Sequence, residues 1–327
     1  QGFEIVCADI KPFEHWFQFN ETFKNYHLDL KEFENCLKVS KGVDYVYNMA
    51  CNMGGMGFIE NNKAECMLSV LINTNLLRAC LEHNVKKYFC VSTDKAANPV
   101  NMMGASKRIM EMFLMRRSSD INISTARFAN VAFSDGSLLY GFNKRIEKRQ
   151  PIAAPNDVKR YFLTPQESGE LCIMSCIFGE NRDIFFPKLA KEKDLLSFSD
   201  LAIKFLKMKG YEAYICSSED EARKLVKTLP KQNKWPCFFS ASDTTGEKTF
   251  EEFYTTNEIL DMDKFKNLGI IKNNLYFDGA KLDNFEKSIK KIKSNITWDK
   301  KSIVNEFFKI IPDFKYFDIN RYLDGKM

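Results

Sequence analysis

The sequence predicts an α/β fold with a doubly wound parallel sheet. Before residue 190, short apolar segments of strand length alternate with segments of helical periodicity. This alternation is typical of parallel sheets that are built from strand–helix–strand units. The chain has 327 residues, of which 45% are hydrophobic and 13% aromatic. That is enough for one large domain, or for one such domain with a smaller companion.

The predicted elements follow one another along the first part of the chain. Strands are expected at 3–9, up to 27–30, and at 43–51, 86–93 and 121–131, and helices at 63–83, 104–117, from 137 and at 167–178. After residue 190 lysine becomes dense, and charged helices separate the strands, with the last helices near 284–294 and 300–311. We therefore predict a first domain over 1–189 and a smaller substrate domain of the α/β class over 190–327.

Composition limits the classes of function. The net charge is only +5, from 48 basic and 43 acidic residues, so a nucleic-acid partner is not expected. No run of about 18 apolar residues occurs, so we expect no membrane span. Ten cysteines without a CxxC pair, and no leader sequence, indicate a reducing, cytoplasmic setting without structural zinc. The three histidines are scattered, and we expect no metal site.

Asp9 ends the first predicted strand and suits dinucleotide binding. In a Rossmann-like unit, a strand, a glycine-rich turn and a helix hold the pyrophosphate, and an acid at the end of the next strand binds the adenosine ribose. Only eight residues precede Asp9, so the first strand–helix unit is expected to be missing from this chain. The alternative is that 3–9 begins another α/β fold. An acid here favours NAD, because it repels the 2′-phosphate of NADP, and NADP stays as the alternative.

Other strand ends supply further candidate ligand contacts. For the cofactor these are Asp29, Leu30, Ala50 and Phe128. Gly54 and Gly55 follow the third strand, but no acid closes the next strand as the dinucleotide fingerprint requires. We interpret these glycines as a loop that lets the backbone approach a ligand, with a purely structural turn as the alternative.

The segment VSTDKAANPVNMMGASK (91–107) resembles the active-site segment of extended short-chain dehydrogenase/reductases. The close match is the bacterial UDP-N-acetylglucosamine 4,6-dehydratase family of polysaccharide biosynthesis. The resemblance continues in ARFANVAFSDGSL (126–138), KRYFLTPQES (159–168), DIFFPKL (183–189) and GEKTFEE (246–252). Residues 29–59, which include KGVDYVYNMACNMGGMGFI, resemble GDP-mannose 3,5-epimerase. Both resemblances imply a nucleotide-sugar enzyme, and they disagree on the reaction.

The dehydratase resemblance implies a catalytic set. Lys107 would bind the nicotinamide ribose of the cofactor, and Met103 stands where the superfamily usually has a tyrosine. Methionine carries no proton, and a branch of the resembled family shares it, so the proton chemistry falls to a neighbouring acid and base. Lys95 would remove the proton from carbon 5, Asp94 would protonate the leaving hydroxyl, and Thr93 would bind the carbon-4 oxygen. In isolation, an Asp–Lys pair is more often an exposed turn.

The same resemblance implies substrate contacts from Asn130, Arg160 and Glu247, together with the Gly54–Gly55 loop. Arginine suits a nucleotide phosphate because its two N–H groups can pair with two oxygens. The purely structural alternatives are a turn for Asn130 and a surface ion pair for Arg160.

Three functions are open at this point. The first is an NAD-dependent 4,6-dehydratase acting on a nucleotide sugar, with UDP-N-acetylglucosamine as the expected substrate. The second is an epimerase, ranked lower because the plant-type epimerase has a cysteine in the loop that reads STDKA here. The third is a non-catalytic NAD(P)-binding regulator, which Met103 and the missing glycine turn suggest and the retained Thr93, Asp94, Lys95 and Lys107 oppose. The superfamily resemblance also implies a homo-oligomer.

Overall fold

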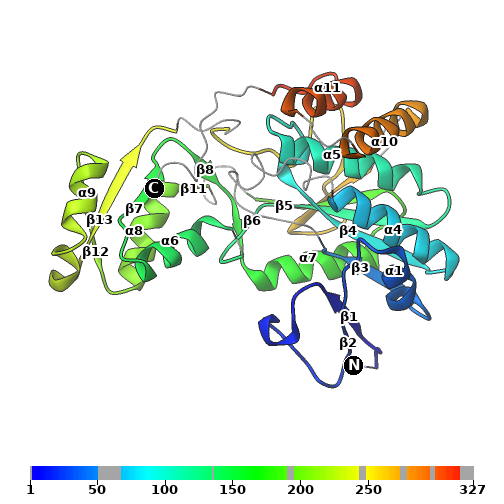
Figure 1. The fold of residues 1–327 in the computed structure, drawn as a ribbon, viewed down its shortest axis with the longest axis horizontal. Coiled ribbons are helices and arrows are strands. Elements are labelled where there is room, and N and C mark those ends of the chain that lie inside the picture. Colours follow the sequence, from blue (N-terminus) through cyan, green and yellow to red (C-terminus); the bar gives the residue numbers. More distant parts are fainter. Residues whose placement is uncertain are drawn as a thin grey trace.

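A six-stranded sheet organises most of the chain, in the spatial order β14-β15-β10-β5-β4-β3 (Figure 1). This computed structural model describes residues 2–50, 68–134, 136–189, 195–242, 248–272, 278–294 and 299–316. The strands are β3 (Tyr45–Asn48), β4 (Lys87–Thr93), β5 (Asn122–Phe128), β10 (Asp183–Pro187), β14 (Ile259–Asp261) and β15 (Leu268–Lys272). The predicted α/β class is confirmed.

The sheet is parallel over four strands and antiparallel at one edge. β3, β4, β5 and β10 pair in parallel, whereas β15 runs antiparallel to both β10 and β14. The short connection from β14 to β15 explains their pairing, because a hairpin needs no crossover helix. The predicted parallel sheet is therefore confirmed, with an antiparallel edge that the sequence did not predict.

Helices cover both faces of this sheet, which makes it doubly wound. Figure 1 shows α7 on one side and α4, α5, α10 and α11 on the other. Their bounds are α1 (Phe33–Ser40), α4 (Leu68–Glu82), α5 (Met102–Arg116), α7 (Pro165–Phe178), α10 (Gly279–Ser294) and α11 (Lys300–Ile310). One buried cluster joins Leu76 of α4 and Ile109 of α5 to Phe285 of α10 and Phe307 of α11. The chain therefore covers its own α4–α5 face.

Polar side chains cap the helices and set where they begin. Asn101, Ser137, Thr164 and Ser197 each accept a hydrogen bond from a backbone N–H in the first turn of the helix that follows. At α7 the cap is reciprocal, since the carboxylate of Glu167 accepts from the backbone N–H of Thr164. Such caps satisfy N–H groups that have no partner inside the helix.

The N-terminal strands form a sheet of their own. β1 (Val6–Asp9) and β2 (Lys24–His27) pair in parallel with each other, and in the described chain neither is hydrogen-bonded to the six-stranded sheet. A single-turn helix, η1 (Phe13–His15), lies between them in sequence. The second strand ends at His27, earlier than the predicted 27–30. This part of the prediction, one continuous sheet, is wrong for the described residues.

A second, smaller unit has its own sheet of three parallel strands, in the order β12-β13-β7. It comprises α6 (Leu138–Glu147), β7 (Ile152–Pro155), α8 (Phe198–Met208), β12 (Glu212–Ile215), α9 (Glu219–Leu225), η3 (Leu229–Gln232) and β13 (Lys234–Ser240). Phe142 of α6, Phe205 of α8 and Trp235 of β13 share its buried core.

The packing does not follow the predicted boundary between 189 and 190. Residues 138–155 pack with the small unit, whereas β14, β15, α10 and α11 return to the large sheet and its helices. The reason is that the chain crosses between the two units several times, which a single cut in the sequence cannot represent. None of the helices described here is long and apolar enough to cross a membrane.

Candidate active site

Thr93, Asp94 and Lys95 lie at the carboxyl end of β4, where the strand turns into the short helix η2 (Asp94–Ala96). The Asp94 Oδ1 atom accepts three hydrogen bonds: from Thr93 Oγ1 at 2.8 Å, from the Lys95 backbone N–H at 2.8 Å and from Lys95 Nζ at 3.1 Å. Asp94 is only 2% exposed. The structure therefore excludes an exposed turn pair and places these three side chains in one locked cluster.

Asn130 joins this cluster from a different strand. Its Oδ1 accepts a hydrogen bond from Lys95 Nζ at 3.2 Å. Asn130 starts β6 (Asn130–Val131), which pairs with β9 (Phe162–Leu163). The amide is thus a ligand-facing partner of Lys95 and not merely part of a turn.

The first turns of α5 pack against the same cluster. Asn101 Oδ1 accepts from the Gly104 backbone N–H at 2.9 Å and caps the helix. Met103 and Lys107 are 8% and 7% exposed and stand one turn apart on α5, so that they share a helix face. Within the described part of the chain, the Lys107 ammonium has no hydrogen-bond or ion-pair partner. An ammonium that makes no bond to the described residues is available to bind a ligand at this site.

Gly104 allows α5 to approach closely the turn that holds Thr93, Asp94 and Lys95. A Cβ atom at this position would lie 2.4 Å from the carbonyl oxygen of Lys95. We expect Gly104→Ala to push α5 away from Lys95, to destabilise the protein by roughly 1–3 kcal/mol and to lower kcat. Urea unfolding and steady-state kinetics measure the two effects. Gly141→Ala is the control, because a Cβ atom there meets nothing within 4 Å, and equal behaviour of the two variants would contradict the prediction.

Arg160 is buried rather than a surface residue. It lies on β8 (Lys159–Arg160), which pairs with β11 (Leu196–Ser197), and it is 4% exposed. Its Nη1 atom donates to the carbonyl oxygens of Lys159 and Lys248 at 2.8 Å. The guanidinium thus fixes the 248–251 segment, and the alternative of a surface ion pair is wrong.

Two charged residues of that segment were not among the predicted site residues. Lys248 and Glu251 lie beside Arg160, and Glu251 is 4% exposed. Burial raises the pKa of the Glu251 carboxyl above its ordinary value, although the charge of Lys95 lowers it. Both residues belong to the GEKTFEE segment, so the signal was present in the sequence. What was missing was their burial.

The predicted cofactor residues divide into two groups. Ala50 and Phe128 lie near Thr93 along the carboxyl edge of the main sheet, since Ala50 follows β3 and Phe128 pairs in register with Thr93. Asp9 is exposed at the end of β1, and its Oδ1 accepts from the Lys11 backbone N–H at 2.8 Å. Asp29 and Leu30 precede α1, where Asp29 pairs with Lys31. Gly54, Gly55 and Glu247 lie outside the described residues.

These positions fit one half of a nicotinamide dinucleotide. The Lys107 ammonium, which has no partner among the described residues, suits its nicotinamide ribose, beside the carboxyl edge of parallel strands where such ligands bind. For the adenosine half, Asp9 offers a carboxylate at a strand end. Its strand is not hydrogen-bonded to the main sheet among the described residues, and no glycine-rich pyrophosphate turn lies in the described chain.

Behind the cluster lies a network of buried charges. Arg127 of β5 is fully buried and pairs with Glu111 of α5 at 2.9 Å and with Glu258 at 2.8 Å. Ser92, next to Thr93, donates to the Glu111 carboxylate at 2.6 Å. The network therefore ties β4, β5 and α5 together directly beneath the residues of the site.

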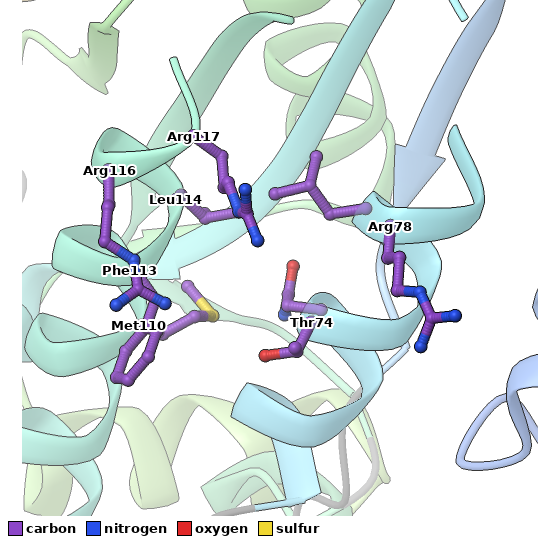
Figure 2. Close-up of a pocket in the computed structure, with 9 residues that line it drawn as sticks. Thr74, Arg78, Met110, Phe113, Leu114, Arg116 and Arg117 are labelled. Carbon is purple, nitrogen blue, oxygen red and sulfur yellow. The ribbon is translucent and has the colours of Figure 1, made fainter. Parts of the chain in front are cut away.

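A separate hollow lies between α4 and α5 (Figure 2). Thr74 of α4 and the C-terminal half of α5, from Met110 onward, line it. Its three arginines already have carboxylate partners, Arg78 with Glu82 at 3.4 Å, Arg116 with Asp283 at 2.5 Å and Arg117 with Asp120 at 3.3 Å. These arginines are already paired, and none of Thr93, Asp94 and Lys95 lines the hollow. We therefore do not place the substrate there.

Comparison with known proteins decides the family. A family model described as polysaccharide biosynthesis protein matches residues 14–273. The chain belongs to this family. The resemblance drawn from the 91–107 segment is confirmed at the level of the polysaccharide biosynthesis family.

The curated relatives of this protein differ from one another in length and in name. An uncharacterized membrane protein, MJ1061 of Methanocaldococcus jannaschii, is 27% identical over 85% of this chain and 83% of its own. The probable polysaccharide biosynthesis protein EpsC of Bacillus subtilis is 29% identical over 62% of this chain, which spans only 30% of EpsC. GDP-mannose 3,5-epimerase 1 of Oryza sativa is 38% identical over 28% of this chain and 25% of its own.

Solved structures share the fold of this family member. Pen from Bacillus thuringiensis superposes with a TM-score of 0.63 at 22% identity, over 78% of this chain and 73% of its own. DesIV from Streptomyces venezuelae, a dTDP-glucose 4,6-dehydratase solved with NAD bound, superposes with a TM-score of 0.60 at 12% identity, over 91% of this chain and 90% of its own. At these identities the likeness establishes the fold.

Proposed function

We propose that this protein is an NAD-dependent nucleotide-sugar 4,6-dehydratase in polysaccharide biosynthesis, with UDP-N-acetylglucosamine as its substrate. The observation that carries the proposal is the buried Thr93–Asp94–Lys95 cluster, with Asn130 on Lys95 and with Lys107 unpartnered among the described residues. Acid, base and cation within one buried site are what an elimination next to a carbonyl group needs. A binding protein has no need of this set.

NAD, when bound, would take the hydride from carbon 4 and return it at carbon 6. Lys107 would hold its nicotinamide ribose, and Asp9 its adenosine ribose. Asp9 is the reason to favour NAD, since a carboxylate repels the 2′-phosphate of NADP.

The side chains of the protein divide the proton transfers among themselves. The carbon-4 hydroxyl would lose its proton to the Asp94 carboxylate through the Thr93 hydroxyl, which donates to Asp94 at 2.8 Å, and Lys95 would remove the proton from carbon 5. Asp94 would deliver a proton to the hydroxyl that leaves carbon 6 as water. Met103 provides the apolar wall on the α5 side, because its thioether has no proton to give.

Asn130 and Arg160 have distinct supporting roles in this proposal. Asn130 orients Lys95 through its 3.2 Å hydrogen bond. Arg160 already donates to the carbonyl oxygens of the 248–251 segment, so that its first task is to hold that segment over the site. Contacts of the loops outside the described residues, including Gly54, Gly55 and Glu247, stay predictions.

Incubation of the purified protein with UDP-N-acetylglucosamine and NAD tests the proposal. We expect a product lighter by one water, with a 4-keto-6-deoxy sugar in its NMR spectrum and deuterium at carbon 5 when the reaction runs in deuterated water. Binding of NAD without any change of the nucleotide sugar would refute the enzymatic assignment and support a regulatory protein.

An epimerase is the second candidate, because a curated relative that matches part of the chain is GDP-mannose 3,5-epimerase 1. An epimerase would return a sugar of unchanged mass with a new configuration. The same product analysis therefore separates the two reactions in one experiment.

A homo-oligomer also stays a proposal. The chain itself covers the α4–α5 face with α10 and α11, so that a second copy would have to use another surface. Light scattering of the purified protein measures the assembly.

A further inference from the structure

Glu251 is a buried carboxyl of the site that the proton transfers above leave without a task. It is 4% exposed and lies on the segment that Arg160 holds. Its Oε1 atom is 3.8 Å from Arg160 Nη2, and its Oε2 atom is 3.5 Å from Lys248 Nζ. These distances allow charge attraction but are too long for good hydrogen bonds.

Two polar atoms here are buried without a hydrogen bond. Neither Glu251 Oε2 nor Lys248 Nζ has a hydrogen-bond partner among the residues that the structure describes. Leaving a buried charged group unsatisfied costs more than an ordinary hydrogen bond contributes. Such atoms are rare in native proteins, and at a functional site they indicate a group that acts on a ligand or a proton.

The Glu251 segment docks against the catalytic turn. Asn98, just after the turn, donates its side-chain N–H to the Glu252 carboxylate at 2.8 Å. Tyr161, next to Arg160, accepts a hydrogen bond from the backbone N–H of Asn130 at 3.2 Å. The first bond holds the segment around Glu251 beside the turn that contains Asp94 and Lys95. The second joins the strand end next to Arg160 to Asn130, the partner of Lys95.

Four charged groups act on the Glu251 carboxyl. Burial is the strongest influence and raises its pKa, and the negative charge of Asp94 raises it further. The positive charges of Lys95, Arg160 and Lys248 lower it, and the net shift is upward. A carboxyl in this state can hold a proton closer to neutral pH than an exposed one can.

Lys95 needs a proton acceptor before it can act as a base. An ammonium has no lone pair, so its proton must leave before carbon 5 is attacked. Of its two hydrogen-bonded neighbours, the Asn130 amide oxygen is a poor proton acceptor, and Asp94 must itself carry a proton for the leaving hydroxyl. A second carboxyl beside the pair can accept this proton. Glu251 is buried, the neighbouring Glu252 is hydrogen-bonded to Asn98 just after the turn, and the charge of Glu251 interacts with both Lys95 and Asp94.

We propose that Glu251 is the proton-exchange partner of Lys95, an inference that rests on the proposed dehydratase function. The Lys95 ammonium passes a proton to the Glu251 carboxylate through an intervening water, since the two groups are not hydrogen-bonded to each other, and leaves a neutral amine and a neutral carboxyl. The amine then takes the carbon-5 proton, and later returns it to carbon 5. Glu251 finally gives its proton back to Lys95, so that no proton is gained or lost over the cycle.

The variant Glu251→Gln tests this role through the pH dependence of kcat. The glutamine keeps the shape but cannot exchange a proton, so we expect kcat to fall roughly 10- to 100-fold, somewhat below the effect of losing a direct acid or base. KM should stay within about threefold. The acidic limb of the pH profile should move to higher pH, because Lys95 must then lose its proton to solvent.

Controls separate this role from a structural one. Glu251→Asp should keep the position of the limb and recover part of kcat, whereas Glu170→Gln, on the exposed surface of α7, should match the wild type. A Glu251→Gln enzyme whose limb does not move, or whose loss lies wholly in KM, would overturn the proposal.

Infrared titration of the substrate-free protein gives a second measurement. We expect the C=O band of a buried carboxyl that titrates above the normal range for glutamate and shifts in Glu251→Asp. Absence of such a band would overturn the role of Glu251 even if Glu251→Gln does not fold. Because no substrate is present, this result is independent of whether the dehydratase assay succeeds.

Discussion

Replacing Lys95 by glutamine is expected to lower kcat for water elimination by roughly 10²- to 10⁴-fold. Glutamine can still hydrogen-bond to Asp94 and Asn130, the two partners of the Lys95 ammonium, but it cannot take a proton from carbon 5. Oxidation at carbon 4 does not need that proton transfer. A single turnover should therefore still show the absorbance of reduced cofactor, while the deuterium label at carbon 5 and the loss of water disappear.

A surface lysine provides the control for this experiment. Lys148→Gln, at the exposed C-terminal end of α6, should retain the activity of the wild type. If Lys95→Gln instead kept kcat within about threefold, Lys95 could not be the base. If both oxidation and elimination vanished and KM rose, Lys95 would serve substrate binding instead.

The substitution Arg127→Met is expected to destabilise the protein by about 3–5 kcal/mol, because it removes the main cation of two buried carboxylates. Only the longer contacts of Arg108, at 3.2 Å to Glu111 and 3.3 Å to Glu258, are then left. Arg127 donates to Glu111 through Nε and Nη2, at 3.0 and 2.9 Å. It donates to Glu258 through Nη1 and Nη2, at 2.9 and 2.8 Å. Urea unfolding at pH 7 measures the loss.

The effect should depend on pH with a definite sign. In the folded protein burial raises the pKa of Glu111 and of Glu258, but the charge and hydrogen bonds of Arg127 outweigh it, and both lie below the ordinary 4.5. Below about pH 4.5 the unfolded chain therefore binds more protons than the folded protein. The stabilisation that the two carboxylates provide is complete above this pH and is lost as the pH falls through their pKa in the folded protein. Without Arg127 the effect of burial is opposed only by the charge of Arg108 and by the hydrogen bonds from Ser92 and from the Thr255 backbone, so the pKa of both carboxyls should rise. The difference in stability between variant and wild type should therefore narrow as the pH falls toward 4.

Two further variants keep this prediction falsifiable. Arg117→Met removes an exposed arginine that pairs with Asp120 at 3.3 Å, and a surface pair is worth less than about 1 kcal/mol. Adding Glu111→Gln and Glu258→Gln to Arg127→Met removes the unpaired charges and should restore part of the stability. A loss for Arg127→Met that is no larger than the loss for Arg117→Met would show that the network does not stabilise the protein.

Local sequence signals were sufficient for most of the regular elements. The alternation of apolar strands and amphipathic helices located β3, β4, β5, α5 and α7, because each of these buries one side or one stripe in the way that its own residues dictate. The predictions failed where pairing depends on distant segments. The antiparallel edge of β14 and β15, the separate β1–β2 sheet and the return of α10 and α11 to the main core have no local signature.

The candidate site shows the same division. The STDK segment and Lys107 follow from the sequence, since the strand that ends in Thr93 and the helix that follows it are adjacent along the chain. Asn130, Arg160 and Glu251 come from three other segments. Only folding brings the Asn130 amide to Lys95 and the Arg160 guanidinium to within 3.8 Å of Glu251.

What the sequence by itself determined is thus the fold class and the family, and it predicted the Thr93–Lys95 turn as the candidate site. All three rest on residues close together in the chain. Only the tertiary structure showed that Asp94 is buried and that Arg160 holds the 248–251 segment. It also brought the Glu251 carboxyl close enough to interact electrostatically with Asp94 and Lys95. The physical reason is that desolvation and charge interactions depend on distance in space and on exclusion of water, and neither can be read from residues that lie far apart in the sequence.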